Sequence, residues 1–80
     1  MMVSAQISIY PLRQEHLSPA IEAVRKALEA YGFQPEVGPM STLVVGGMPE
    51  VFQALQEAFA QAAATGQVVM TVTVSNACPI

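Results

Sequence analysis

Uncharged polar side chains are concentrated in three strand-like segments of this 80-residue chain. They alternate with apolar residues at positions where a strand that only faces solvent would more often carry Lys, Glu or Arg. The candidate residues are Gln6, Ser8 and Tyr10 in the first segment, Ser41 and Thr42 in the second, and Ser75, Asn76 and Cys78 in the third. Hydroxyl and amide groups on strands can hydrogen-bond a polar ligand, each contributing about 0.5 to 1.5 kcal/mol net. The pattern indicates a ligand pocket or a contact between subunits.

The sequence contains no assembled catalytic set. His16, the only histidine, follows Glu15 in a loop, and no Ser or Cys is placed for it to activate. The Gly46-Gly47 pair lacks the following Lys of a phosphate-binding loop, so we interpret it as a turn. The remaining acidic and methionine residues fit surface charges and packing residues: Glu22, Glu29, Glu50, Glu57, Met40 and Met70. We therefore predict a protein that is not an enzyme and holds no metal or cofactor.

Cys78 is the single cysteine, so it cannot form an internal disulfide or build a four-cysteine metal site within one chain. Its sequence neighbours are not basic, so nothing there would make the thiol reactive. We interpret Cys78 as a packing or pocket-lining residue. A single cysteine fits a reducing compartment, and we expect a cytoplasmic protein.

The composition favours self-association. The chain is 52% hydrophobic and only 11% charged, with a net charge of -3. A monomer with so few charges would expose apolar surface, so we predict a homo-oligomer, either a dimer or a tetramer. The three basic residues, Arg13, Arg25 and Lys26, do not form a patch that could bind nucleic acid. The N-terminal segment does not resemble a signal peptide, and no apolar run is long enough to insert into a membrane.

Hydrophobic periodicity predicts the elements that position the polar residues. A period of two places Val3, Ala5, Ile7 and Ile9 on one face of a first strand, which Pro11 ends. Two amphipathic helices are predicted, one from Ser18-Pro19 to Gly32 and one from Pro49 to Gly66. Their apolar stripes are Leu17, Ile21, Val24, Leu28 and Tyr31, and Val51, Leu55, Ala58, Phe59 and Ala62. Further strands are predicted at residues 33–37, 40–45 and 67–75.

The resulting βαββαβ order predicts one α+β domain over residues 1–80, with a ferredoxin-like arrangement. Its four-stranded antiparallel sheet would carry both helices on one face. Gln6, Ser8 and Tyr10 would then lie on the open face, with Tyr10 near Ser41 and Thr42. Ser75, Asn76 and Cys78 would return past Ser4 at the other end of the sheet. These two groups can belong to one groove or to two sites.

Three motifs in this order resemble the YkoF-like thiamine-binding proteins: Ser8-x-Tyr10-Pro11, Ser41-Thr42, and Ser75-x-x-Cys78-Pro79. The resemblance covers nearly the whole chain, and members of that family carry one or two ferredoxin-like repeats. It implies a single-repeat protein that binds thiamine, or its hydroxymethylpyrimidine moiety, in vitamin salvage or transport. Gln6 and Asn76 depart from the residue types of tandem members.

Two other classes of function stay open on the residues themselves. A regulatory or scaffolding module would use the polar sheet face only to pair subunits. A small enzyme such as an acylphosphatase shares the βαββαβ order, but Arg13 lacks the surrounding glycine-rich loop that such an enzyme uses to bind phosphate. Of these two, the subunit-pairing module is the better alternative.

Overall fold

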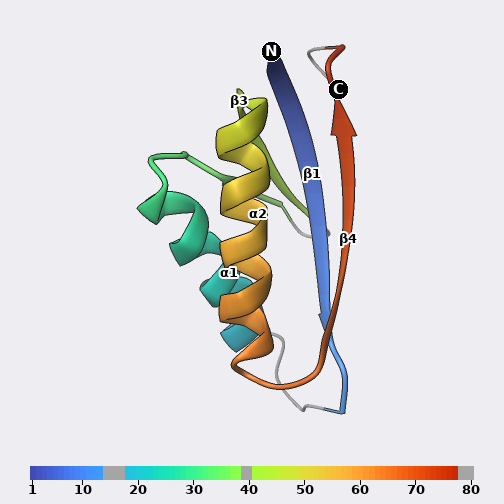
Figure 1. Cartoon of the computed structure of the whole chain (residues 1–80). Coiled ribbons are helices and arrows are strands. Elements are labelled where there is room, and N and C mark those ends of the chain that lie inside the picture. The colour runs from blue at the N-terminus through green and yellow to red at the C-terminus, as the bar shows by residue number, and fades with distance from the viewer. Residues whose placement is uncertain (14–17, 39–40, 78–80) are drawn as a thin grey trace.

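The computed structural model describes residues 1–13, 18–38 and 41–77. Its elements are β1 (Met2–Pro11), α1 (Ser18–Ala30), β2 (Glu36–Val37), β3 (Thr42–Gly47), α2 (Met48–Ala63) and β4 (Val68–Ser75). The strands form one antiparallel sheet in the order β2-β3-β1-β4. Both helices lie on the same side of this sheet (Figure 1). The predicted ferredoxin-like α+β fold is confirmed.

Glycine ends α1 as the sequence predicts. Gly32 has a positive φ of 86°, and its N–H donates to the carbonyl of Glu29. The N–H of Phe33 donates to the carbonyl of Leu28, which completes the hydrogen-bond pattern of a Schellman motif. The chain therefore reverses at Gly32 and returns toward the sheet edge.

The Gly46-Gly47 pair is not a turn between elements, because β3 continues through both residues into α2. A Cβ atom at Gly46 would collide with the ring of Phe33, so glycine is needed here for a close approach. Phe33 packs against the core instead of extending a strand. The strand predicted at residues 33–37 is accordingly reduced to Glu36–Val37.

The core lies between the helices and one face of the sheet. From β1 it contains Val3, Ala5 and Ile7, as the period of two predicts. Two predicted stripe residues are exposed instead. Phe59 is 43% exposed, because the fully buried Ala58 faces the sheet and the next residue turns toward the flank of α2. Tyr31 is also exposed, since it follows the last residue of α1.

Strand register places the residues of the open face in rows that cross the sheet. One row contains Glu36, Leu43, Gln6 and Thr73, and the next contains Val45, Ser4 and Ser75. Ser8 stands opposite Thr71, and Tyr10 opposite Val69. Among the described residues, neither helix is long and apolar enough to cross a bilayer.

Candidate functional site

A hollow of about 340 Å³ opens on the helix-free face of the sheet, at the end of β2. Gln6, Glu36 and Leu43 lie side by side across three strands and form part of its lining. Val37, Gly38 and Ser41 complete the lining. Two of the predicted site residues, Gln6 and Ser41, are therefore brought together although 35 positions separate them in the sequence.

Gln6 and Ser41 form a hydrogen bond across β1 and the chain leading into β3. The amide nitrogen of Gln6 donates to Oγ of Ser41 at 3.2 Å. The amide has a second N–H and a carbonyl oxygen, and the Ser41 hydroxyl has a proton that it can donate. The pair therefore presents both donors and acceptors, already oriented, to a ligand that enters the hollow.

Glu36 is a site residue that sequence reasoning missed. It is the only charged residue in any of the four described strands. Its pairing with Leu43 turns it toward the open face. The available signal was that a carboxylate stands inside a predicted edge strand, but its face could not be assigned because the strand is only two residues long.

A second hollow of about 300 Å³ adjoins the first and shares Glu36 and Leu43 with it. Its other lining residues are Gly32, Phe33, Gln34 and Val45. Both hollows mix polar and apolar side chains: the first has the Gln6 amide and the Ser41 hydroxyl beside Val37 and Leu43. The second has the Phe33 ring and Val45 beside the Gln34 amide. Glu36 lies at the boundary between these two environments.

Ser8 and Tyr10 share the open face with Gln6 but lie further along β1. Ser8 is half-buried opposite Thr71, and Tyr10 is exposed opposite Val69. Tyr10 lies four positions along β1 from Gln6, a rise of about 13 Å. Ser8 is therefore a neighbour of the hollow, and Tyr10 extends the polar surface beyond it.

Thr42 does not lie where we expected it. It stands opposite Ile7, is only 8% exposed, and faces the helices. Successive residues of a strand point to opposite faces, so Ser41 and Thr42 cannot both face the same ligand. Thr42, a candidate site residue from the sequence, therefore lies on the helix-covered face and does not line the hollow with Ser41.

Ser75 and Asn76 lie at the end of β4, away from the hollow. Ser75 stands opposite Ser4 as predicted, and its Oγ accepts the backbone N–H of Ala77 at 2.9 Å. This bond closes a turn of the chain just after β4. Asn76 is exposed. Cys78 and His16 lie outside the described residues.

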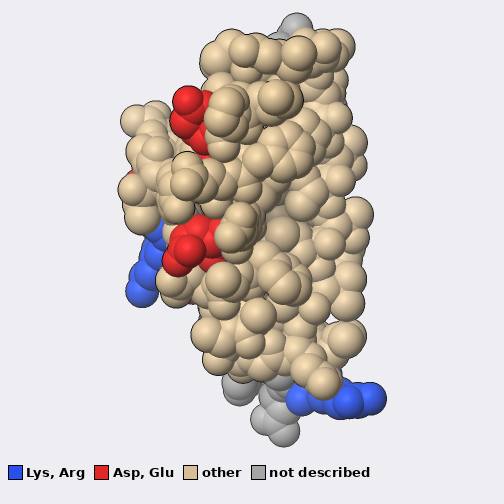
Figure 2. Space-filling view, in the orientation of Figure 1, with Lys and Arg blue, Asp and Glu red and all other residues tan. Residues whose placement is uncertain are grey.

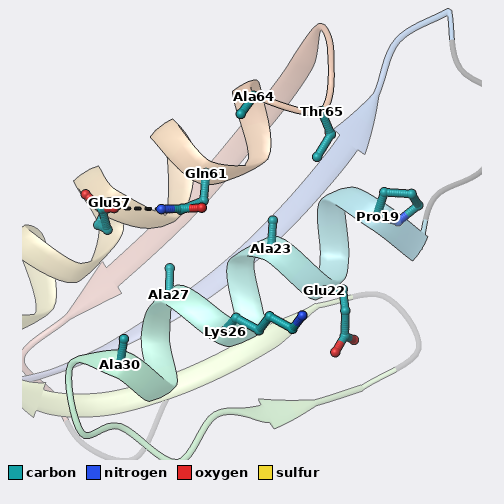
Figure 3. Close-up of a pocket in the computed structure, with 10 residues that line it drawn as sticks. All are labelled: Pro19, Glu22, Ala23, Lys26, Ala27, Ala30, Glu57, Gln61, Ala64 and Thr65. Carbon is teal, nitrogen blue, oxygen red and sulfur yellow. Dashed lines mark hydrogen bonds between the residues drawn. The ribbon is translucent and has the colours of Figure 1, made fainter.

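A larger groove of about 610 Å³ runs between the two helices, on the side of the sheet opposite to the predicted site (Figure 3). Alanines form much of its lining, among them Ala23, Ala27 and Ala64. The Gln61 amide at its edge donates to Glu57 at 2.9 Å, as the dashed line shows. None of the predicted site residues lines this groove.

The ion pairs found among the described residues lie on α1. Arg25 donates to Glu29 at 2.9 Å and also pairs with Glu22. The hydrogen bond from Arg25 lowers the pKa of the Glu22 carboxyl, and the same bond raises the pKa of Arg25. This network is exposed on a helix and takes no part in the hollow.

Solved structures share this architecture over nearly the whole chain. A hypothetical protein of Methanocaldococcus jannascii is 22% identical with a TM-score of 0.85, and the match covers 99% of this chain and 84% of that one. A protein of Streptococcus pneumoniae is 25% identical with a TM-score of 0.85, over 94% and 86% of the two chains. A Thermotoga maritima protein, named provisionally for thiamine biosynthesis or salvage, is 21% identical with a TM-score of 0.82, over 94% and 83%.

A comparison with curated proteins found no match for this sequence. The family pattern described as "Thiamine-binding protein" matches residues 5–76. The match begins within β1, ends just after β4, and includes Gln6, Glu36 and Ser41. The chain therefore belongs to the thiamine-binding protein family.

Proposed function

We propose that the protein binds thiamine, or its hydroxymethylpyrimidine moiety, without catalysing a reaction, in salvage or transport of the vitamin. The observation that carries this proposal is the hydrogen-bonded pair of Gln6 and Ser41 beside Glu36 in a hollow of the open sheet face. Membership of the thiamine-binding family supports the ligand class. The name of the Thermotoga maritima protein supports a role in thiamine biosynthesis or salvage.

The chemistry of the hollow matches such a ligand. The aminopyrimidine ring carries donors and acceptors along one edge, and the Gln6 amide and Ser41 hydroxyl can pair with both kinds of group. The adjoining hollow, with Phe33 and Val45, offers apolar surface to a second ring. The single cysteine fits a reducing compartment, and we place this binding in the cytoplasm.

Isothermal titration calorimetry with thiamine and with hydroxymethylpyrimidine tests the proposal. Gln6→Ala and Ser41→Ala should each weaken binding by about 1 to 3 kcal/mol, because each removes one partner of a hydrogen bond to the ligand. Gln56→Ala is the matched control, since it deletes the same amide from an exposed position of α2. It should leave the affinity unchanged within about 0.5 kcal/mol.

A wild-type chain that binds neither compound at millimolar concentration would exclude this function. The subunit-pairing module would then take its place. If the wild type binds but Gln6→Ala and Ser41→Ala match it, the function stands and the site lies elsewhere. The Ser75 and Asn76 end of the sheet would then be the next place to mutate.

The alternative of a subunit-pairing module is favoured by a specific surface. The edge strand β4 carries no charged residue and no proline, so it lacks the usual protection of a sheet edge. In Figure 2, the acidic side chains lie over the helices, and the surface along β4 shows none. Met48, Phe52 and Phe59 are exposed on the flank of α2 away from the groove with α1.

We propose that this surface and the open sheet face bring copies of the chain together as a dimer or tetramer. Phe52 is 51% exposed and Val69 is 45% exposed, which is a large apolar surface for so small a domain. Self-association would cover it. Assembly is compatible with ligand binding, because a partner sheet over the hollow would shield the ligand from water.

A further inference from the structure

The hollow on the open face has a single fixed charge among its described residues, and that charge is negative. Glu36 is its one ionisable side chain, beside the uncharged Gln6, Ser41 and Leu43. No ion pair joins Glu36 to a basic residue in the described part of the chain. Within the described ranges, its carboxylate therefore has no cationic partner.

The three basic residues are placed elsewhere. Arg25 is held between Glu22 and Glu29 on α1. Lys26 lines the groove between the helices, on the other side of the sheet (Figure 3). Arg13 donates to the side chain of Gln67 at 3.2 Å, near the start of β4. An anionic group entering the hollow would thus meet a carboxylate and no cation that could compensate for the repulsion.

We propose that Glu36 selects the ligand by its charge. The site prefers a cationic heteroaromatic compound to its phosphate esters and to the uncharged pyrimidine alone. This inference rests on the proposed function and adds a preferred form: unphosphorylated thiamine, whose thiazolium ring carries a permanent positive charge. Glu36 is the specificity-determining residue, whereas Gln6 and Ser41 recognise the pyrimidine.

The geometry supports this division of roles. Gln6 and Ser41 lie in the first hollow, and Glu36 stands between that hollow and the second one. A pyrimidine that hydrogen-bonds to Gln6 and Ser41 would extend its second ring past Glu36 toward Phe33. The ring of Phe33 would add a face on which a cationic ring can pack.

Calorimetry of the full chain with three compounds tests the inference: thiamine, thiamine monophosphate and hydroxymethylpyrimidine. Wild type should bind thiamine more tightly than both of the others. Glu36→Gln keeps the size and shape of the side chain and removes its charge. It should weaken thiamine binding by about three- to five-fold, the upper end of what an exposed charge pair contributes. It should leave the affinity for hydroxymethylpyrimidine within about two-fold and reduce the discrimination against the monophosphate.

The control is Glu50→Gln, which removes the same charge from an exposed position in the first turn of α2. It should not change the affinity for thiamine by more than about two-fold. Added salt should weaken thiamine binding to wild type more than to Glu36→Gln, because ions screen the charge contact. Circular dichroism of each variant confirms that the fold is kept.

The possible outcomes separate this inference from the function on which it rests. If wild type binds none of the three compounds, the proposed function fails and the inference fails with it. If wild type binds thiamine and Glu36→Gln binds it equally well, the function stands and charge selection is overturned. If Glu36→Gln lost affinity equally for thiamine and hydroxymethylpyrimidine, Glu36 would contribute to the shape of the hollow and not to selection by charge. If Glu50→Gln lost as much thiamine affinity as Glu36→Gln, the effect would come from the net charge of the protein and not from the position of Glu36.

Discussion

Thr42 stands directly opposite Ile7 on the helix-covered face, while its neighbour Ser41 accepts a hydrogen bond from Gln6 on the open face. Two adjacent polar residues therefore have different surroundings. Ser41→Ala should weaken thiamine binding as described above, whereas Thr42→Val should leave the affinity within about two-fold and change the free energy of unfolding instead. Calorimetry and urea denaturation of the two variants measure these effects. Loss of affinity in Thr42→Val with unchanged stability would contradict the assigned faces.

Ile7 is the largest side chain of β1 in the core and is 1% exposed. Ile7→Ala should lower the free energy of unfolding by about 2 to 5 kcal/mol, a large share of the stability of a small domain. Leu12→Ala, at an exposed position just after β1, is the control and should cost much less. Urea denaturation monitored by circular dichroism gives both values. A loss of only a few tenths for Ile7→Ala would mean that Ile7 does not pack beneath the helices.

Because β4 is an edge strand without charged residues, we expect the protein to self-associate. Wild type should sediment as a dimer or tetramer at micromolar concentration. Val69→Lys places a charge beside the exposed edge and should shift the protein toward smaller species. Ala30→Lys adds the same charge at an exposed position of α1 and should not change the assembly. A wild-type monomer at micromolar concentration would remove the basis for self-association.

The Glu22 and Arg25 pair makes a prediction about pH. A carboxyl whose pKa is lowered in the folded state stabilises the fold above its unfolded pKa, and this stabilisation is lost as pH falls through the folded pKa. Glu22→Gln should therefore be slightly less stable than wild type at neutral pH, and the difference should vanish well below the ordinary value of 4.5. Thermal unfolding across this pH range measures the difference. If the difference in thermal stability between wild type and Glu22→Gln persisted in strong acid, the ion pair with Arg25 would not be its cause.

The sequence predicted the element order because the strand period of two and the helix period of 3.6 can each be recognised within a short stretch of residues. The alternation in β1 placed Val3, Ala5 and Ile7 in the core and Gln6 and Tyr10 at exposed positions. Ser4 departs from the pattern, because it is only 1% exposed although it pairs within the rows of the open face. β3 offered no such signal, since Leu43, Val44 and Val45 are all apolar, and the face of Thr42 was therefore open to error. The Gly46-Gly47 pair resembled a turn because the ring of Phe33, which requires glycine there, comes from a distant part of the chain.

Only part of the site was predicted, because residue types can be recognised in the sequence whereas contacts between strands cannot. Gln6 and Ser41 have the residue types of a polar site, but their contact depends on strand order and register, which only the folded chain defines. Glu36 was missed because two residues are too few to display a strand period. Ser75 and Asn76 have uncharged polar side chains like those of Gln6 and Ser41. They lie at the end of β4, away from the hollow.

The shortness of β2 has a consequence for how proteins of this kind can diverge. Only two residue pairs, Glu36 with Leu43 and Val37 with Thr42, fix the face on which the carboxylate lies. A change of loop length that shifts the register of β2 against β3 by one residue would turn the carboxylate to the opposite face, and both helices and the three longer strands would stay in place. Ligand preference could thus be altered by a change of loop length alone, with no substitution in the hollow itself.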